Sequence, residues 1–202
     1  MAQSDARDRM VAGAADMLRR RGLNATSVRE LAKHSGAPLG STYHYFPGGK
    51  SELAAEAVRF ADGLAARKLV EELPGGPVAG LRAFVEMWRK VVVDSDFRTG
   101  CPVLAVSVED QPDDDDEPRR AAAAAFDHWT ALLAESLGTH GATASAAAQT
   151  ATLIVAAIEG AVAMCRAQRS THPLDRTADA LENVVRAVTG QNWSGNGMDV
   201  IT

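Results

Sequence analysis

The sequence predicts an all-α protein of about nine helices, with three helices in an N-terminal domain and the others in a larger C-terminal domain. Apolar residues recur at intervals of three and four along most of the chain, which is the period of a helix with one buried face. No segment has the strict alternation of a half-buried strand, and glycine and proline separate the periodic segments. With 202 residues, of which 46% are hydrophobic, the chain is large enough to bury a sizeable core.

The first two predicted helices have clear starts and stops. One covers residues 5–21, with its apolar side chains on one side, and ends at Gly22. Ser27 and Glu30 have the spacing of a capping box, in which each side chain satisfies a backbone N–H at the start of a helix. The second helix therefore begins directly after Ser27. It ends at Gly36, because glycine adopts the positive φ of a helix C-terminus without a steric penalty.

A third, short helix is predicted over residues 39–45, after Pro38, whose missing N–H is tolerated in the first turn. Two helices joined by a glycine-containing turn form a helix-turn-helix, whose second helix can lie in the major groove of DNA. An ordinary αα-hairpin is the alternative. Lys50 is placed to hold a phosphate at the start of the next helix, and Leu39 to meet a thymine methyl. The expected DNA contacts are Thr26, Ser27, Arg29, Pro38, Leu39, Gly40, Ser41, Tyr43, His44 and Lys50.

The remaining segments predict a helical C-terminal domain. A long helix that starts near Gly49 can connect the two domains rigidly, and the Leu73–Pro77 segment ends it. Residues 100–118 are less regular and hold an acidic run, which we expect to be a solvated loop. The helices of this domain are predicted over residues 49–72, 78–94, 118–137, 143–169 and 174–189. The two domains are predicted over residues 1–48 and 49–190. A disordered tail is expected over residues 191–202.

The net charge of −5 is unevenly distributed along the chain. Residues 1–50 hold eight Lys or Arg and four Asp or Glu, which gives +4, whereas the rest holds thirteen and twenty-two, which gives −9. A basic N-terminal domain gains affinity for DNA by releasing counterions from phosphates, and an acidic remainder leaves only one face able to dock. Arg19, Arg20 and Arg21 contribute to this charge, although they also complement the dipole at the end of their helix.

Several other classes of protein are disfavoured by the sequence. The five histidines are scattered and have no catalytic or metal-ligand spacing, so we expect no enzyme, no metal and no cofactor. Cys101 and Cys165 lie far apart, which argues against a disulfide framework. The most apolar run, residues 151–165, contains Glu159 and is too short to cross a bilayer. We therefore expect a cytoplasmic protein without a membrane partner.

Four stretches of the N-terminal motif have a recognisable pattern: Thr26–Ala32, Ser35–Ala37, Ser41–Phe46 and Lys50–Leu53. They resemble the DNA-binding domain of the tetracycline-repressor (TetR) family. Three further stretches, Ala37–Ser41, Phe46–Lys50 and Gly100–Ala105, are similar to the LmrA/YxaF-like subgroup of that family. Thr42 departs from the family pattern, since the family usually places a larger aliphatic residue there.

The last two predicted helices are apolar on more than one face, which indicates a homodimer. The resemblance implies a four-helix interface that these helices form with their symmetry mates. A fully intramolecular core is the alternative. The candidate interface residues are Ala151, Val155, Ile158, Val162, Leu181, Val184, Val185 and Val188.

The resemblance also implies double-stranded operator DNA as a partner and a small-molecule effector in the C-terminal domain. The aromatic residues expected around the core are candidates to line an effector cavity, with core filling as the alternative role. Glu159 either contacts the ligand or is paired, because a buried unpaired carboxylate is costly. The candidate ligand residues are Phe84, Trp88, Cys101, Phe126, Trp129 and Glu159. The expected function is a repressor that releases a palindromic operator when its ligand binds; a DNA-binding activator or a ligand-independent regulator is the alternative.

Overall fold

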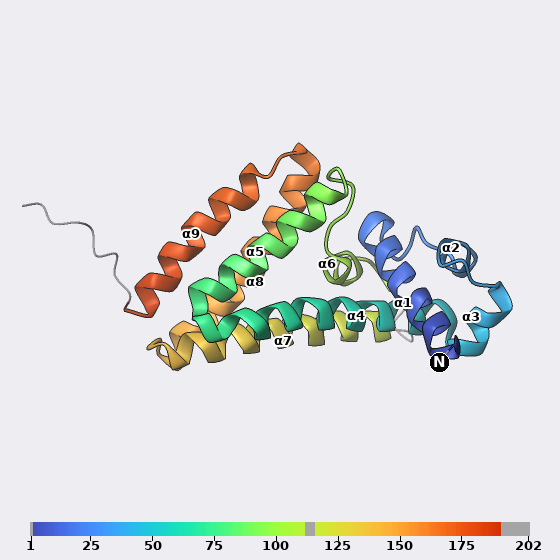
Figure 1. Ribbon diagram of the computed structural model, residues 1–202, viewed down its shortest axis with the longest axis horizontal. Helices are drawn as coiled ribbons and strands as arrows, with labels where there is room; N and C mark the ends of the chain where they lie inside the picture. Colours follow the sequence, from blue (N-terminus) through green and yellow to red (C-terminus); the bar gives the residue numbers. More distant parts are fainter. Residues whose placement is uncertain (1, 112–115, 191–202) are drawn as a thin grey trace, which may run out of the picture.

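The computed structural model describes residues 2–111 and 116–190 as an all-α fold, which confirms the predicted fold class (Figure 1). The predicted tail over residues 191–202 and most of the acidic run lie outside the described residues. The described elements are α1 (Ala2–Arg21), α2 (Val28–His34), α3 (Leu39–Tyr45), α4 (Gly49–Glu72), the 3-10 turn η1 (Leu73–Gly75), α5 (Pro77–Asp94), α6 (Pro102–Ser107), α7 (Glu117–Thr139), α8 (Ala144–Gln168) and α9 (His172–Val188).

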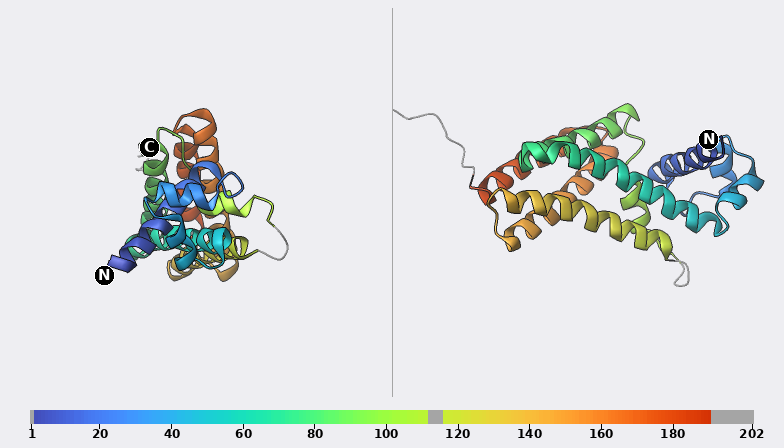
Figure 2. Two further views of the ribbon diagram at one scale, coloured as in Figure 1. Left: turned by 90° about the vertical axis from the view of Figure 1, so that its right-hand side faces the viewer. Right: turned by 60° about the horizontal axis from the view of Figure 1, so that its bottom comes forward.

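The helices form an elongated molecule with a small head and a larger body. The head consists of α1, α2 and α3 at one end, and α4 to α9 form the body (Figure 1). Helix α4 runs from the head into the body and packs most extensively along α7, so that the two lie side by side (Figure 2). The short α6 packs against α1, α4 and α7 at the junction of head and body. The orientation of the head therefore depends on α1, α4 and α6.

Local sequence signals account for the ends of the head helices. The Ser27 Oγ accepts a hydrogen bond from the Glu30 N–H at 3.2 Å, and the Ser27 N–H donates to the Glu30 carboxylate at 3.0 Å. The capping box is thus confirmed. Gly36 has a φ of +64° directly beyond the end of α2, as the sequence predicts.

The segment that the sequence left irregular contains the short helix α6. Pro102 occupies its first turn, and the Cys101 Sγ at the N-cap accepts a hydrogen bond from the Leu104 N–H at 3.4 Å. Both features favour a helix start, because proline needs no N–H partner there and the thiol satisfies an orphan donor. The sequence pattern did not indicate this helix, since it is only six residues long.

Helix α8 is longer than the apolar run that the sequence indicated. It extends over 25 residues and is long and apolar enough to cross a membrane by length and composition alone. Half of its most apolar window is buried inside the protein, where α8 packs between α7 and α9. This burial is typical of the core helix of a globular domain.

Candidate DNA interface and effector cavity

Helix α3 lies on the head with one side buried and the other exposed. Thr42 and, directly after the helix, Phe46 point into the head core. On the outer side, Gly40 and His44 are exposed, and the Tyr43 side chain is 54% exposed. No atom lies within 4 Å of a Cβ built at Gly40, so packing within the chain does not require glycine there. The outer side of α3 is free to approach a partner.

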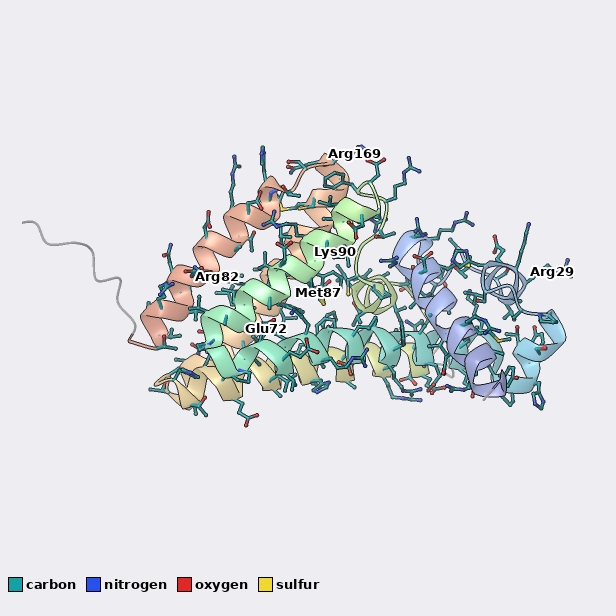
Figure 3. The ribbon with its side chains drawn as sticks, viewed as in Figure 1. Arg29, Glu72, Arg82, Met87, Lys90 and Arg169 are labelled. Carbon is teal, nitrogen blue, oxygen red and sulfur yellow. The ribbon has the colours of Figure 1, made fainter. Side chains whose placement is uncertain are left out.

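The head brings together predicted DNA-binding residues that come from three segments of the chain. A groove of about 590 Å³ is lined by the turn before α2, the start of α2, Tyr43 of α3 and Lys50 of α4. Ser27 and Arg29 are among the residues that line it. Arg29 is exposed at the head end of the molecule, far from Arg82 on the body (Figure 3). Hydroxyl, guanidinium and ammonium donors on one surface suit the phosphate oxygens of a nucleic acid.

The other predicted DNA contacts on the head differ in how exposed their side chains are. Thr26 is only 2% exposed, and its hydroxyl donates a hydrogen bond to the Gly22 carbonyl at 2.7 Å. The Thr26 side chain therefore holds the turn between α1 and α2 and is too buried to contact DNA. Leu39 begins α3, but its side chain lies outside the described part of the chain. Pro38 is exposed and Ser41 is half-buried.

The arginine cluster at the end of α1 is largely engaged in ion pairs. Asp16 accepts hydrogen bonds from Arg19 at 2.6 Å and from Arg20 at 2.8 Å, and its carboxylate also lies 3.0 Å from the His34 ring. Burial alone would raise the pKa of Asp16, but the hydrogen bonds from Arg20 and Arg19 outweigh it and lower the pKa to about 2. Of the two roles that the sequence left open, this geometry supports the structural one.

The predicted dimer residues mostly face the interior of the chain. Six of the eight, including Ile158 and Val185, are buried within the single protomer, and Val184 and Val188 are half-buried. These six side chains pack into the protomer's own core, so they are not exposed to a partner. The opposite side of α8 is exposed and carries small and apolar residues, with Leu153 46% and Met164 51% exposed. The exposed residues on this side are Gln149, Thr152, Leu153, Ala156, Gly160, Ala163, Met164, Ala167 and Gln168.

The predicted ligand-binding aromatic residues form one packed cluster. Phe84, Trp88 and Trp129 are buried and meet edge to face, with ring centroids 5.7 to 6.4 Å apart. Phe126 is half-buried and packs on Trp129 at 5.7 Å. Such contacts stabilise the core beyond the area that they bury. The cluster fits the core-filling role, and Trp88 also lines a cavity.

Glu159 of α8 and Cys101 at the N-cap of α6 form a buried pair of titratable groups. Glu159 is 3% exposed, and neither of its carboxyl oxygens forms a hydrogen bond of ordinary geometry. Burial raises the pKa of Glu159 to about 8, an effect that the neighbouring Cys101 thiol partly offsets. Burial and the nearby Glu159 carboxyl hold the pKa of the Cys101 thiol well above its usual value. Both groups are therefore uncharged at neutral pH.

A cavity of about 440 Å³ lies where the head meets the body. Its walls come from α1, α4 and α5, and from Gly100 and Pro102 at the start of α6. Sequence reasoning missed almost all of its lining, because half of it consists of small or aliphatic residues that look like ordinary core positions. The residues that line it are Ala12, Ala15, Asp16, Arg19, Phe60, Ala61, Leu64, Ala65, Lys68, Met87, Trp88, Val91, Gly100 and Pro102. Among the described residues, no three His, Cys, Asp or Glu side chains gather as they would around a metal ion.

Comparison with known proteins places this head and body in one family. Residues 11–57 match the family described as bacterial regulatory proteins, tetR family, and residues 77–180 match the C-terminal domain of LmrA/YxaF-like transcriptional regulators. The chain belongs to the TetR family of transcriptional regulators. The regulator is 40% identical to an uncharacterized HTH-type transcriptional regulator of Mycobacterium tuberculosis over 185 residues, which are 90% of this chain and 94% of the relative. It is 28% identical to the HTH-type transcriptional regulator LmrA of Bacillus subtilis, over 92% of this chain and all of LmrA.

Solved structures agree with the fold of the regulator. A TetR regulatory protein from Rhodobacter sphaeroides superposes with a TM-score of 0.77 at 23% identity, over 89% of this chain and 98% of that one. A TetR transcriptional regulator from Legionella pneumophila reaches the same TM-score at 18% identity, over 87% and 94% of the two chains. The match to the family makes the regulator a DNA-binding protein, since members of the family bind operator DNA and function as dimers. Its relatives are regulators rather than enzymes.

Proposed function

We propose that this regulator is a ligand-responsive repressor, which occupies a palindromic operator as an unliganded dimer and leaves it when a small molecule binds the body. The exposed outer side of α3, with Tyr43 and Lys50 on a shared groove, is the observation that carries the proposal. Base contacts from α3 specify the sequence, while Lys50 and Arg29 hold phosphates and position the head.

The exposed side of α8 supports the dimeric form of this repressor. Small residues such as Gly160 let a second helix approach closely, and Leu153 and Met164 supply apolar area that would otherwise face water. A twofold axis through this surface makes the same patch serve both protomers. Two heads related by that axis read half-sites about one helical turn, roughly 34–36 Å, apart.

The DNA-binding part of the proposal is tested with operator fragments recovered from a genomic selection. Tyr43→Ala and Lys50→Ala weaken binding in gel shifts, while circular dichroism shows an unchanged helix content. Lys50→Ala also lowers the slope of log affinity against log salt by about 1, because one phosphate contact is lost. Lys90→Ala removes the same charge from an exposed site on the body and leaves binding unchanged. If Tyr43→Ala and Lys50→Ala bind the operator as tightly as Lys90→Ala and the wild-type protein, the assigned surface does not read DNA.

The repressor part is tested separately from DNA binding. A reporter gene behind the selected operator is silent in the presence of the regulator and is expressed when a compound that raises the melting temperature of the protein is added. Transcription that increases with the regulator present would instead identify an activator, and a reporter that no stabilising compound affects would identify a ligand-independent regulator.

A further inference from the structure

We propose that the effector binds at the head–body junction, in the cavity between α1, α4 and α5, and that it is an uncharged, largely apolar molecule. This inference rests on the proposed ligand-responsive function and specifies its site. Small-molecule sites occupy roughly 300–1,000 Å³ and are mostly apolar, and the junction cavity has a volume of about 440 Å³. The aromatic rings in the body pack on one another, whereas the junction cavity is open and has mostly apolar walls.

The apolar side chains of the cavity come from both α4 and α5. Phe60 and Leu64 on α4 are 39% and 46% exposed, a large exposure for two such residues one turn apart. Met87 and Val91 on α5 are half-buried across from them, and Met87 lies on the side of α5 that faces α4 (Figure 3). A ligand that removes these surfaces from water gains about 25 cal/mol per Å² of apolar area.

The charged groups at the cavity are already paired with groups of the same chain. Lys68 donates a hydrogen bond to Glu72 at 2.6 Å, and Arg19 donates to Asp16 at 2.6 Å. The Glu72 contact raises the pKa of Lys68. A charged ligand would lose its hydration without finding a free counter-charge. The cavity therefore favours a neutral molecule over its ionised analogue.

The head contributes a wall of this cavity through Ala12 and Ala15 of α1. The same helix is tied to the body at its C-terminal end, next to the cavity. The Gly100 N–H donates to the Arg19 carbonyl at 3.0 Å, and Gly100 and Arg19 both line the cavity. A ligand bound between α1 and α4 lies beside the hydrogen bond between Gly100 and Arg19. It therefore acts directly on a contact that sets the angle of the head.

Two further contacts hold the end of α1 on the body. The Arg166 guanidinium of α8 donates to the Arg20 carbonyl at 3.4 Å and to the Arg98 carbonyl at 3.3 Å. The Glu109 carboxylate accepts the backbone N–H groups of Leu23 and Asn24 at 2.9 and 2.5 Å. Helix α8 carries the exposed apolar face as well as Arg166, so a shift of α1 changes how each head is held relative to that face.

The site is tested by attaching an apolar group inside the cavity. Cys101 and Cys165 are buried, so a cysteine introduced by Leu64→Cys reacts selectively with benzyl methanethiosulfonate, which forms a mixed disulfide and releases methanesulfinate. Val93→Cys is the matched control, because Val93 is similarly exposed on α5 at 48% but does not line the cavity. Mass spectrometry measures the extent of labelling, and Ala61→Cys replaces Leu64→Cys if that variant does not fold.

The expected result is that benzyl labelling at Leu64→Cys weakens operator binding by roughly tenfold or more, within the range of ordinary allosteric coupling, while labelled Val93→Cys binds like the unlabelled protein. Unchanged or tighter binding of labelled Leu64→Cys overturns the inference. An unlabelled wild-type protein that binds no duplex would refute the proposed function instead, so the two failures are distinguishable.

The chemical class is tested with a pair of fluorescent probes that differ by one charged group. N-phenylnaphthylamine is neutral, and anilinonaphthalene sulfonate is its sulfonated analogue. We expect the neutral probe to bind the wild-type regulator more tightly, and Leu64→Trp, but not Val93→Trp, to abolish its binding by filling the cavity. Tighter binding of the sulfonate refutes the assignment of a neutral ligand, and retained binding to Leu64→Trp refutes the assignment of the site.

Discussion

Replacing Glu159 with glutamine is expected to remove a specific pH dependence of folding stability. The Glu159 carboxyl is buried without a well-formed hydrogen bond, and burial raises its pKa from 4.5 to about 8 although the neighbouring Cys101 thiol lowers it. Between these two values the folded chain holds a proton that the unfolded chain has released. The free energy of unfolding therefore decreases as the pH rises through this window, and it is least affected by this group below pH 4.5.

The size of the effect follows from the two pKa values. The full shift corresponds to about 5 kcal/mol, because one pKa unit corresponds to about 1.4 kcal/mol. Between about pH 5 and about pH 7, the wild-type protein is expected to lose roughly 2–3 kcal/mol relative to Glu159→Gln. The variant keeps the volume of the side chain but does not titrate, so any constant difference in packing cancels when the two pH values are compared.

The measurement is urea unfolding at both pH values, followed by circular dichroism at one fixed protein concentration, because the stability of a dimer depends on concentration. Glu159→Asp serves as a control that keeps a titratable carboxyl and should retain a pH dependence. The reasoning is refuted if wild type and Glu159→Gln lose stability in parallel between the two pH values. Parallel curves would mean that the carboxyl is ionised in the folded protein and has a partner that offsets its burial.

Three further predictions concern the head, the junction and the dimer. Thr42→Val raises the free energy of unfolding by about 1 kcal/mol in urea titrations, because it removes a buried hydroxyl without a hydrogen-bond partner; a loss of stability would show that the hydroxyl is satisfied. Glu109→Ala speeds amide hydrogen exchange at Leu23 and Asn24, which lose their acceptor, and unchanged protection there would contradict the assigned tie. Met164→Lys shifts the protein toward monomers in analytical ultracentrifugation with its helix content retained, and an intact dimer would place the interface elsewhere.

The candidate DNA interface was largely predictable because its signals are local. The capping box of Ser27 and Glu30 and the glycine after α2 depend on residues within a few positions of one another, so spacing alone places the two helices. The burial of the Thr26 side chain could not be predicted from local spacing. A threonine beside a capping serine looks equally available in the sequence, and only the fold of the turn directs its hydroxyl to the Gly22 carbonyl.

The junction cavity, where we propose that an effector binds, could not be predicted in the same way. Aromatic residues were the natural candidates, but Phe84 and Trp129 fill space in the core. The junction cavity is instead bounded by alanines of α1 and by Phe60 and Leu64 of α4. A cavity is space that neighbouring helices leave unfilled, and its position depends on their angles and separations, which no single helix encodes.

The sequence by itself determined that this chain is helical, where most helices begin and end, that its N-terminal part is basic and contains a helix-turn-helix, and which family it resembles. These properties follow from short-range periodicity, capping and composition. Only the tertiary structure decided which side of α8 remains exposed, that Glu159 is buried beside Cys101, and that a cavity lies where the head meets the body. The physical reason is that burial depends on which helices pack together, and α8 is apolar on more sides than its neighbours can cover.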